Sequence, residues 1–110
     1  MQSTVRSTID NPRISVTLYM RCLLERLAKA ARMDDFLADT QRRSTFTGEQ
    51  VTGLASAFTV ENLGGFTDEE IMQIFCWYAR LRYDMTDMAK QLITYFRNPV
   101  RHKETSSHAN

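Results

Sequence analysis

Apolar residues recur every three or four positions between residues 71 and 95, and this pattern outlines the main helix of the chain. Spacing of this kind keeps one apolar seam on one side of an α-helix. In the second half the remaining faces become polar, so we expect a helix that is buried at its start and half-solvated at its end. The seam consists of Ile71, Ile74, Tyr78, Leu81, Met85, Met88, Leu92 and Tyr95.

The length of this helix raises a question of space. Unbroken from Asp68 to Arg97, it would be roughly 45 Å long, whereas a compact chain of this size has a diameter of about 34 Å. Either the helix breaks between Tyr83 and Thr86, where Asp84 or Thr86 starts a new helix, or a second copy of the chain covers an overhang. The three-four spacing continues through this region without a slip, so the sequence favours the unbroken helix.

An earlier helix is predicted to begin at Asn11-Pro12. Asparagine caps free amides, and proline at the first helical position loses an amide that has no partner there. The pattern loses phase around residues 33–35, so this helix either continues to about Thr40 or restarts at Asp34. Its expected apolar seam is Val16, Met20, Leu23, Leu27 and Ala30, widened by Leu18, Leu24, Ala28 and Ala31.

A four-residue motif, Phe-Thr-x-Glu, occurs three times between the two helices, starting at Phe46, Phe58 and Phe66. Each threonine is well placed as a helix N-cap, and each glutamate falls in the first turn, where the helix dipole favours negative charge. An apolar residue stands five positions after each phenylalanine, which is the spacing of a hydrophobic staple. The predicted starts are Thr47 with a capping box to Gln50, Thr59, and Thr67 with a capping box to Glu70; the staple partners are Val51, Leu63 and Ile71.

These patterns predict an all-α protein with an N-terminal helix, one or two short connecting helices and a long amphipathic C-terminal helix. The short helices are expected at residues 48–57 and 60–63, the second ended by Gly64-Gly65. Pro99 disfavours helical geometry in the residue before it. We therefore expect a single helical domain at residues 11–98, a flexible arm at 1–10 and a disordered polar tail at 99–110.

Composition fits one modest core, since 43% of the 110 residues are hydrophobic and 25% are charged. The formal net charge of +1 at pH 7 gives no overall attraction to nucleic acid or to an anionic membrane. No leader-like apolar run and no stretch of about 18 apolar residues is present, so a cytoplasmic protein is expected. Cys22 and Cys76 lie within apolar helical patterns and are predicted to fill the core as reduced thiols.

Residues for catalysis or metal binding are sparse. The two histidines, His102 and His108, stand in the polar tail, without metal-ligand spacing to a cysteine or a carboxylate. Gly64-Gly65 precedes an acidic helix start that would repel a phosphate. The sequence therefore predicts a non-enzymatic protein with no metal, no cofactor and no small-molecule substrate.

Binding to another protein is the function that the sequence favours. Six methionines with one Trp, four Tyr and six Phe exceed the needs of a small helical core, and methionine suits surfaces that repack around partners. A second apolar stripe, Met72, Cys76, Ala79 and Tyr83, is expected opposite the seam. We predict a small regulator or adaptor, for example one that holds a transcription regulator inactive or serves a secretion component, and a homodimer. The candidate interface residues are Met72, Cys76, Trp77, Tyr83 and Met88; an equal alternative is that they fill the core of a monomer or homodimer.

Two other functions are compatible with the sequence. A DNA-binding regulator would use arginines of the helical domain, but the candidate recognition helix opens with residues 68–70, which are all acidic and carry the wrong sign for phosphates. The third interpretation is a purely structural helical subunit. The arginines of the DNA-binding alternative are Arg42, Arg43, Arg80 and Arg82.

Overall fold

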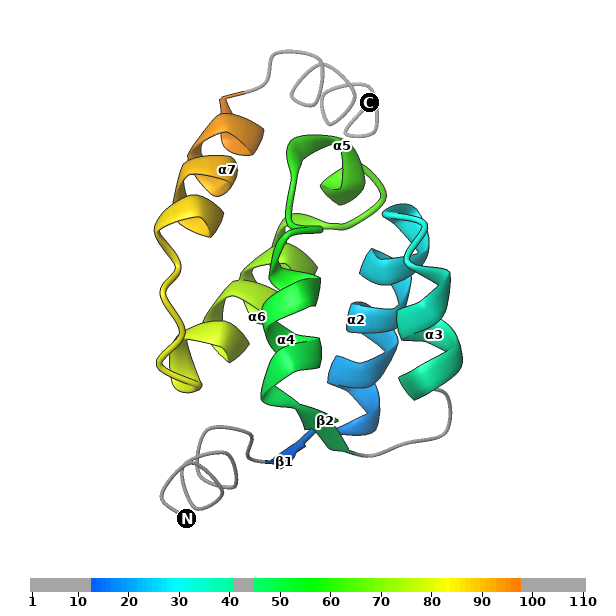
Figure 1. Ribbon diagram of the computed structural model, residues 1–110. Helices are drawn as coiled ribbons and strands as arrows, with labels where there is room; N and C mark the ends of the chain where they lie inside the picture. Colours follow the sequence, from blue (N-terminus) through cyan, green and yellow to red (C-terminus); the bar gives the residue numbers. More distant parts are fainter. Residues whose placement is uncertain (1–12, 41–44, 98–110) are drawn as a thin grey trace. The chain divides into compact units, whose positions relative to one another are not determined.

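The computed structural model describes residues 13–40 and 45–97 and shows a mainly helical protein (Figure 1), which confirms the predicted fold class. The predicted arm at 1–10 and tail at 99–110 lie outside the described residues, as do Arg42, Arg43 and both histidines. The chain divides into two compact units, Met1–Ala57 and Phe58–Asn110.

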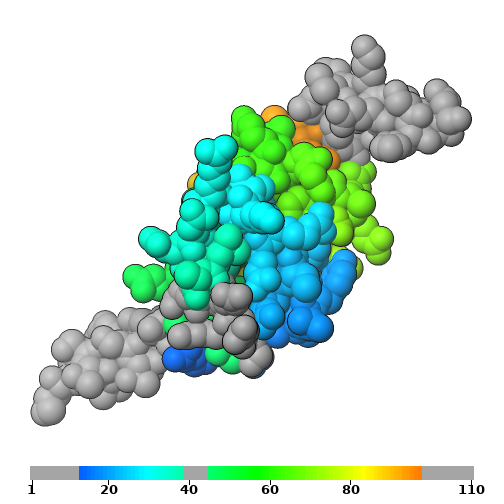
Figure 2. Space-filling model, turned by 90° about the vertical axis from the view of Figure 1, so that its right-hand side faces the viewer, coloured from blue at the N-terminus to red at the C-terminus, as the bar shows by residue number. Residues whose placement is uncertain are grey.

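The first unit combines helices with one pair of short strands. In Figure 1, β1 and β2 run side by side in antiparallel pairing, with Ile14 opposite Phe46. Helices α2 and α3 lie against each other, and their blue and cyan surfaces adjoin in Figure 2. The elements are β1 (Arg13–Ser15), α2 (Leu18–Ala30), α3 (Asp34–Thr40), β2 (Thr45–Thr47) and α4 (Gly48–Ala55).

The predicted start of the first helix at Asn11-Pro12 is wrong. Residues 13–15 form β1, and α2 begins only at Leu18, after the N-cap Thr17, whose side chain accepts a hydrogen bond of 3.1 Å from the amide of Met20. The β-branched residues at this point favour extended backbone, and pairing with β2 satisfies that backbone. A strand partner more than thirty residues away therefore overrides a good local capping signal.

The core of the first unit follows most of the predicted seam of α2, but Leu18 and Ala30 are exposed. Leu18 was expected in the core, but its side chain is 72% exposed. It stands two positions before buried Met20, so the two side chains point about 160° apart around the helix. The buried apolar residues of this unit are Val16, Met20, Leu23, Leu24, Leu27, Ala28, Phe36, Phe46, Val51, Leu54 and Ala57.

The second unit consists, over its described residues, of α5 (Val60–Leu63), α6 (Asp68–Arg80) and α7 (Thr86–Phe96). Helix α7 runs beside α5 in Figure 1 and packs against it. The Tyr95 hydroxyl donates a buried hydrogen bond of 3.4 Å to the carbonyl of Phe66. The buried apolar residues are Phe58, Leu63, Phe66, Ile71, Ile74, Tyr78, Met88 and Tyr95.

The predicted unbroken helix from residue 68 to residue 97 is wrong. The structure instead has the alternative, a break in the helix, which separates α6 from α7. One continuous helix would place Tyr95 about 44 Å along the axis from Phe66. The hydrogen bond between these two residues instead requires α7 to fold back, so that its end meets the beginning of α6. The apolar spacing survives the break because both helices turn their seams toward the same core.

A Schellman motif ends α6. Arg82 adopts left-handed backbone with φ of 59°, its amide donates to the carbonyl of Ala79 (3.0 Å), and the amide of Tyr83 donates to the carbonyl of Tyr78 (3.3 Å). The Tyr83 ring folds back onto Tyr78, with 5.3 Å between ring centroids. This contact is the apolar closure that usually accompanies the motif.

Asp84 then prepares the start of α7. Its carboxylate accepts hydrogen bonds from the Thr86 amide (3.1 Å) and the Thr86 hydroxyl (2.8 Å). These bonds favour the charged carboxylate and lower the pKa of Asp84. Both residues were possible starts from the sequence, and in the structure they act together.

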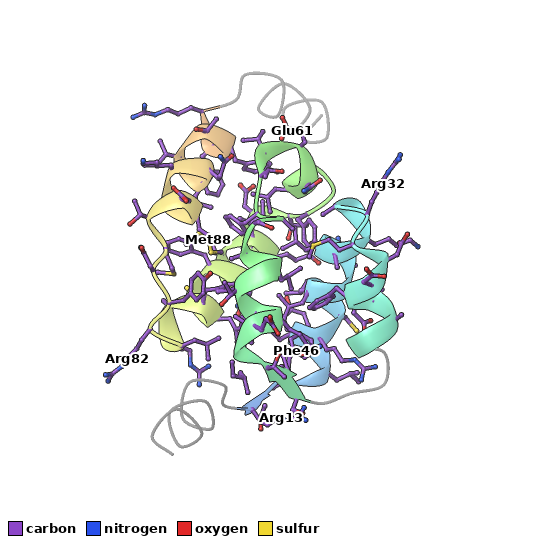
Figure 3. The ribbon with its side chains drawn as sticks, viewed as in Figure 1. Arg13, Arg32, Phe46, Glu61, Arg82 and Met88 are labelled. Carbon is purple, nitrogen blue, oxygen red and sulfur yellow. The ribbon has the colours of Figure 1, made fainter. Side chains whose placement is uncertain are left out.

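The same device ends α2. Arg32 also has φ of 59°, and its amide donates to the carbonyl of Lys29 (3.1 Å). The amide of Met33 donates to the carbonyl of Ala28 (2.9 Å). The open choice at residues 33–35 is therefore settled in favour of a restart, with α3 beginning at Asp34. Arg32 and Arg82 both project away from the ribbon in Figure 3.

Replacing Arg82 with glycine should stabilise the protein. Left-handed backbone costs an ordinary residue roughly 1 kcal/mol that glycine avoids, although part of this is lost because glycine is more flexible in the unfolded chain. We expect Arg82→Gly to raise the free energy of unfolding by about 0.5 kcal/mol. The control Arg80→Gly, inside the last turn of α6, should lower it by about 1 kcal/mol. Urea denaturation measures both, and equal losses for the two variants would contradict the left-handed assignment.

All three predicted N-caps are confirmed. The side chains of Thr47, Thr59 and Thr67 accept hydrogen bonds of 3.1, 3.3 and 3.1 Å from the amides three residues later. Gln50 and Glu70 return bonds of 2.8 and 3.0 Å to the cap amides, so both capping boxes are present. The three phenylalanines and their staple partners are buried. Helix α5 ends at its predicted position, and α4 ends at Ala55, two residues early.

Loss of the Thr67 cap should weaken the start of α6. We expect Thr67→Ala to lower the free energy of unfolding by about 1 kcal/mol, because the amide of Glu70 loses the threonine hydroxyl oxygen that accepts its hydrogen bond. Thr59→Ala should cost less, since its helix has only four residues. Denaturation midpoints test this order, and an unchanged midpoint for Thr67→Ala would remove the capping role.

Candidate functional site

Helix α6 has a buried side and an apolar exposed side. Ile71, Ile74 and Tyr78 are fully buried at 0% exposure, whereas Met72, Cys76 and Ala79 are exposed, Met72 at 39%. The exposed three fall at steps of four and three, within about 60° around the helix. We call Met72, Cys76 and Ala79 the α6 stripe. It is held in place because the opposite side of the same helix anchors the core of the second unit.

The other predicted interface residues do not join the α6 stripe. Trp77 is half-buried with its ring 5.1 Å from that of Tyr78, and it lies about 140° around the helix from Met72. Tyr83 is half-buried against Tyr78. Of the five predicted residues, the structure thus brings together only two on one exposed surface.

Met88, labelled in Figure 3, is 3% exposed and belongs to the core of the second unit. The prediction that it contributes to an interface does not fit this position. The physical reason is the break after α6, which turns α7 back so that its seam faces inward. Met88 belongs to the predicted apolar seam, and that seam faces the core in α7 as it does in α6.

The predicted burial of both cysteines is also wrong, since Cys22 and Cys76 are exposed. Each stands four residues after an exposed apolar side chain, Leu18 in α2 and Met72 in α6, and therefore on the outer side of its helix. Periodicity alone assigned these thiols to the core because an apolar residue on either side of a helix carries the same signal.

Exposed apolar residues outside α6 were not predicted. Tyr19 in α2 is 53% exposed and Ile93 in α7 is 54% exposed, in addition to Leu18. Ile93 follows directly after Leu92 of the predicted seam, and Tyr19 directly precedes Met20. Each is an apolar residue at a position that the three-four spacing does not assign to the seam. That mismatch is the available signal for an outward position.

Charges border the α6 stripe at both ends. Glu69 is exposed in the first turn of α6, and Arg80 is exposed in the last turn. Buried Tyr78, on the opposite side, has its pKa raised by burial and by the nearby Tyr83, so its hydroxyl stays neutral. The stripe therefore carries apolar contact area in its middle and opposite charges at its two ends.

Neither a metal-holding cluster nor a membrane-spanning helix is found among the described residues. No group of three or more histidine, cysteine, aspartate or glutamate side chains there is arranged to hold a metal ion. None of the helices described is long and apolar enough to span a membrane. Of the arginines considered for DNA binding, Arg80 and Arg82 are exposed at the end of α6, on a helix whose first turn is acidic.

No protein-family model matches this sequence, and neither the curated proteins nor the solved structures include a significant match to it.

Proposed function

We propose that this chain is a non-enzymatic regulatory or adaptor protein that binds another protein through the α6 stripe. One observation carries the proposal: Met72, Cys76 and Ala79 lie together on the exposed side of α6, opposite its buried anchor residues. The side chains of methionine, cysteine and alanine offer contact area without strongly polar groups that would need hydrogen-bond partners in an interface. Methionine adapts its shape to a partner surface, and the small side chain of Ala79 allows a partner helix to approach closely.

The shape of the surface points to a helical partner. A stripe at steps of four and three residues is complementary to an apolar stripe of the same spacing on a second helix. The polar ends of α6 then restrict how that helix is oriented, since like charges placed opposite each other oppose binding. The anchoring of α6 in the core means that the stripe is already formed before binding, which reduces the entropy cost of association.

The test is capture of partners by variants that alter the stripe and retain the fold. Purified full-length wild type and Met72→Glu are each immobilised and exposed to native extract, and the retained proteins are identified by mass spectrometry. We expect a partner that wild type retains and that Met72→Glu loses, because a charge in the contact would have to be desolvated. Circular dichroism should show equal helix content in both proteins.

Ile93→Glu is the matched control. It places the same charge on an exposed apolar residue of the same unit, but on α7 and outside the α6 stripe. This variant should keep the partner that Met72→Glu loses. Retention of the same partners by all three proteins, or loss from both variants alike, would contradict a binding role for the α6 stripe.

A further inference from the structure

We propose that a second copy of this chain binds the α6 stripe, with the two α6 helices antiparallel across a two-fold axis. This inference rests on the proposed function, since it names the occupant of the same surface. It is carried by the order of charged and apolar residues along the exposed side of α6. Four exposed side chains, Glu69, Met72, Cys76 and Arg80, follow one another at steps of three, four and four residues.

These four residues share one side of the helix. At 100° per residue they fall within about 80° around the axis of α6. An antiparallel second α6 would place Glu69 of each copy opposite Arg80 of the other, and Met72 opposite Cys76. Two attractive charge pairs would then flank an apolar centre, which is the complementarity that an isologous interface requires.

The positions of the pairs agree on one symmetry axis. A two-fold axis that pairs Glu69 with Arg80 crosses the helix midway between them, at position 74.5 of the chain. An axis that pairs Met72 with Cys76 crosses it at position 74. Half a residue is about 0.75 Å along a helix, so one two-fold axis satisfies both pairs. Neither Glu69 nor Arg80 forms an ion pair with another described residue, so both are available.

The other exposed apolar residues do not have this property. On α2, exposed Leu18 is followed on the same side by basic Arg26 and Lys29, so an antiparallel copy would set a cation against an apolar side chain. On α7, the charged residues on the side of Ile93 are Lys90 and Arg97, both basic, so an antiparallel copy would bring like charges together. Self-complementarity is therefore specific to α6 among the described helices with exposed large apolar residues.

The contact is small. A helix of 13 residues is about 20 Å long, and an interface along one such helix is of the transient class. We expect a reversible dimer that forms with rising protein concentration, in which the stripe is covered by a second copy.

Sedimentation equilibrium of the full chain tests the pairing through charge reversal. Glu69→Arg alone and Arg80→Glu alone each place two like-charge pairs at the interface, so each should weaken the dimer at least about tenfold. An equimolar mixture of these two variants places opposite charges together again at both ends. The mixture should therefore recover dimer at close to the wild-type dissociation constant.

Asp87→Arg is the matched control for Glu69→Arg. Both residues are the second residue of their helices and both are acidic, so reversal disturbs the helix dipole equally in each. Asp87→Arg should leave dimerisation at the wild-type level.

Three outcomes would overturn the inference. The first is a wild-type protein that stays monomeric at the highest attainable concentration. If Met72→Glu nevertheless loses a partner in the capture experiment, the proposed function stands and only the pairing of two copies fails. The second is a mixture of Glu69→Arg and Arg80→Glu that dimerises no better than either variant alone. The third is a dimer that none of the α6 changes weakens, which would place the contact elsewhere on the chain.

Discussion

Ile74→Glu should unfold the second unit, whereas Met72→Glu, two residues away on the same helix, should leave it folded. Ile74 is fully buried and Met72 is 39% exposed. A carboxylate at position 74 would either lose its hydration without a partner or force the core open. We expect a loss of about 4 kcal/mol or more, which is close to the whole stability of a small domain.

Trp77 provides the measurement for this pair of variants. It is the single tryptophan of the chain, it lies half-buried on α6, and its ring contacts Tyr78. Its emission should shift to the red in Ile74→Glu under native conditions and stay at the wild-type wavelength in Met72→Glu. A Met72→Glu protein that unfolds as readily as Ile74→Glu would show that the α6 stripe is internal.

Phe46→Ala should have the second-largest effect, on the first unit. Phe46, labelled in Figure 3, is fully buried in β2, and its ring meets that of Phe36 edge to face at a centroid distance of 5.5 Å. Truncation removes this contact and leaves a cavity, which typically costs about 3 to 5 kcal/mol. The control Tyr19→Ala removes an aromatic side chain that is 53% exposed and should change stability by less than about 0.5 kcal/mol.

Thermal denaturation followed by circular dichroism distinguishes these two variants. Phe46→Ala is expected to melt well below wild type, and Tyr19→Ala within a few degrees of it. Similar melting temperatures for the two proteins would contradict the position of Phe46 at the centre of the first unit.

The helix starts were predictable because their physics is local. Thr47, Thr59 and Thr67 each need only an amide three residues away, and that amide belongs to the residue directly after each Phe-Thr-x-Glu motif. The same holds for the short helix α5, which the sequence placed at its observed residues. Capping chemistry can therefore be read from a few consecutive residues with no knowledge of the rest of the fold.

The chain reversal after α6 was not predicted, because its causes are not local. Arg82 has no intrinsic preference for left-handed backbone, and the Schellman closure depends on Tyr83 folding onto Tyr78. The hydrogen bond between Tyr95 and Phe66 spans 29 residues. Apolar periodicity records which side of a helix meets the core and contains no information about the direction in which the next helix runs.

The same limit applies to the candidate site. Periodicity identified the second stripe of α6 and correctly separated Met72 and Cys76 from the seam, but it also predicted that both thiols were core residues. Met88 was included in the interface for its adaptable side chain, although its place in the apolar seam already indicated the buried position that it has. The pairing of β1 with β2 was missed for a related reason, since Ile14 and Phe46 are 32 residues apart and neither strand has more than three residues.

The reactivity of Cys76 tests the central claim, that the α6 stripe lies outside the core and is covered on association. In a Cys22→Ser background, Cys76 is the one remaining thiol of the chain. At low protein concentration and under native conditions, it should react with Ellman's reagent at the rate of an exposed cysteine. The rate should fall as protein concentration rises and the stripe becomes covered. A Cys76 that reacts only when the protein is globally unfolded, or at one rate at every concentration, would contradict the account.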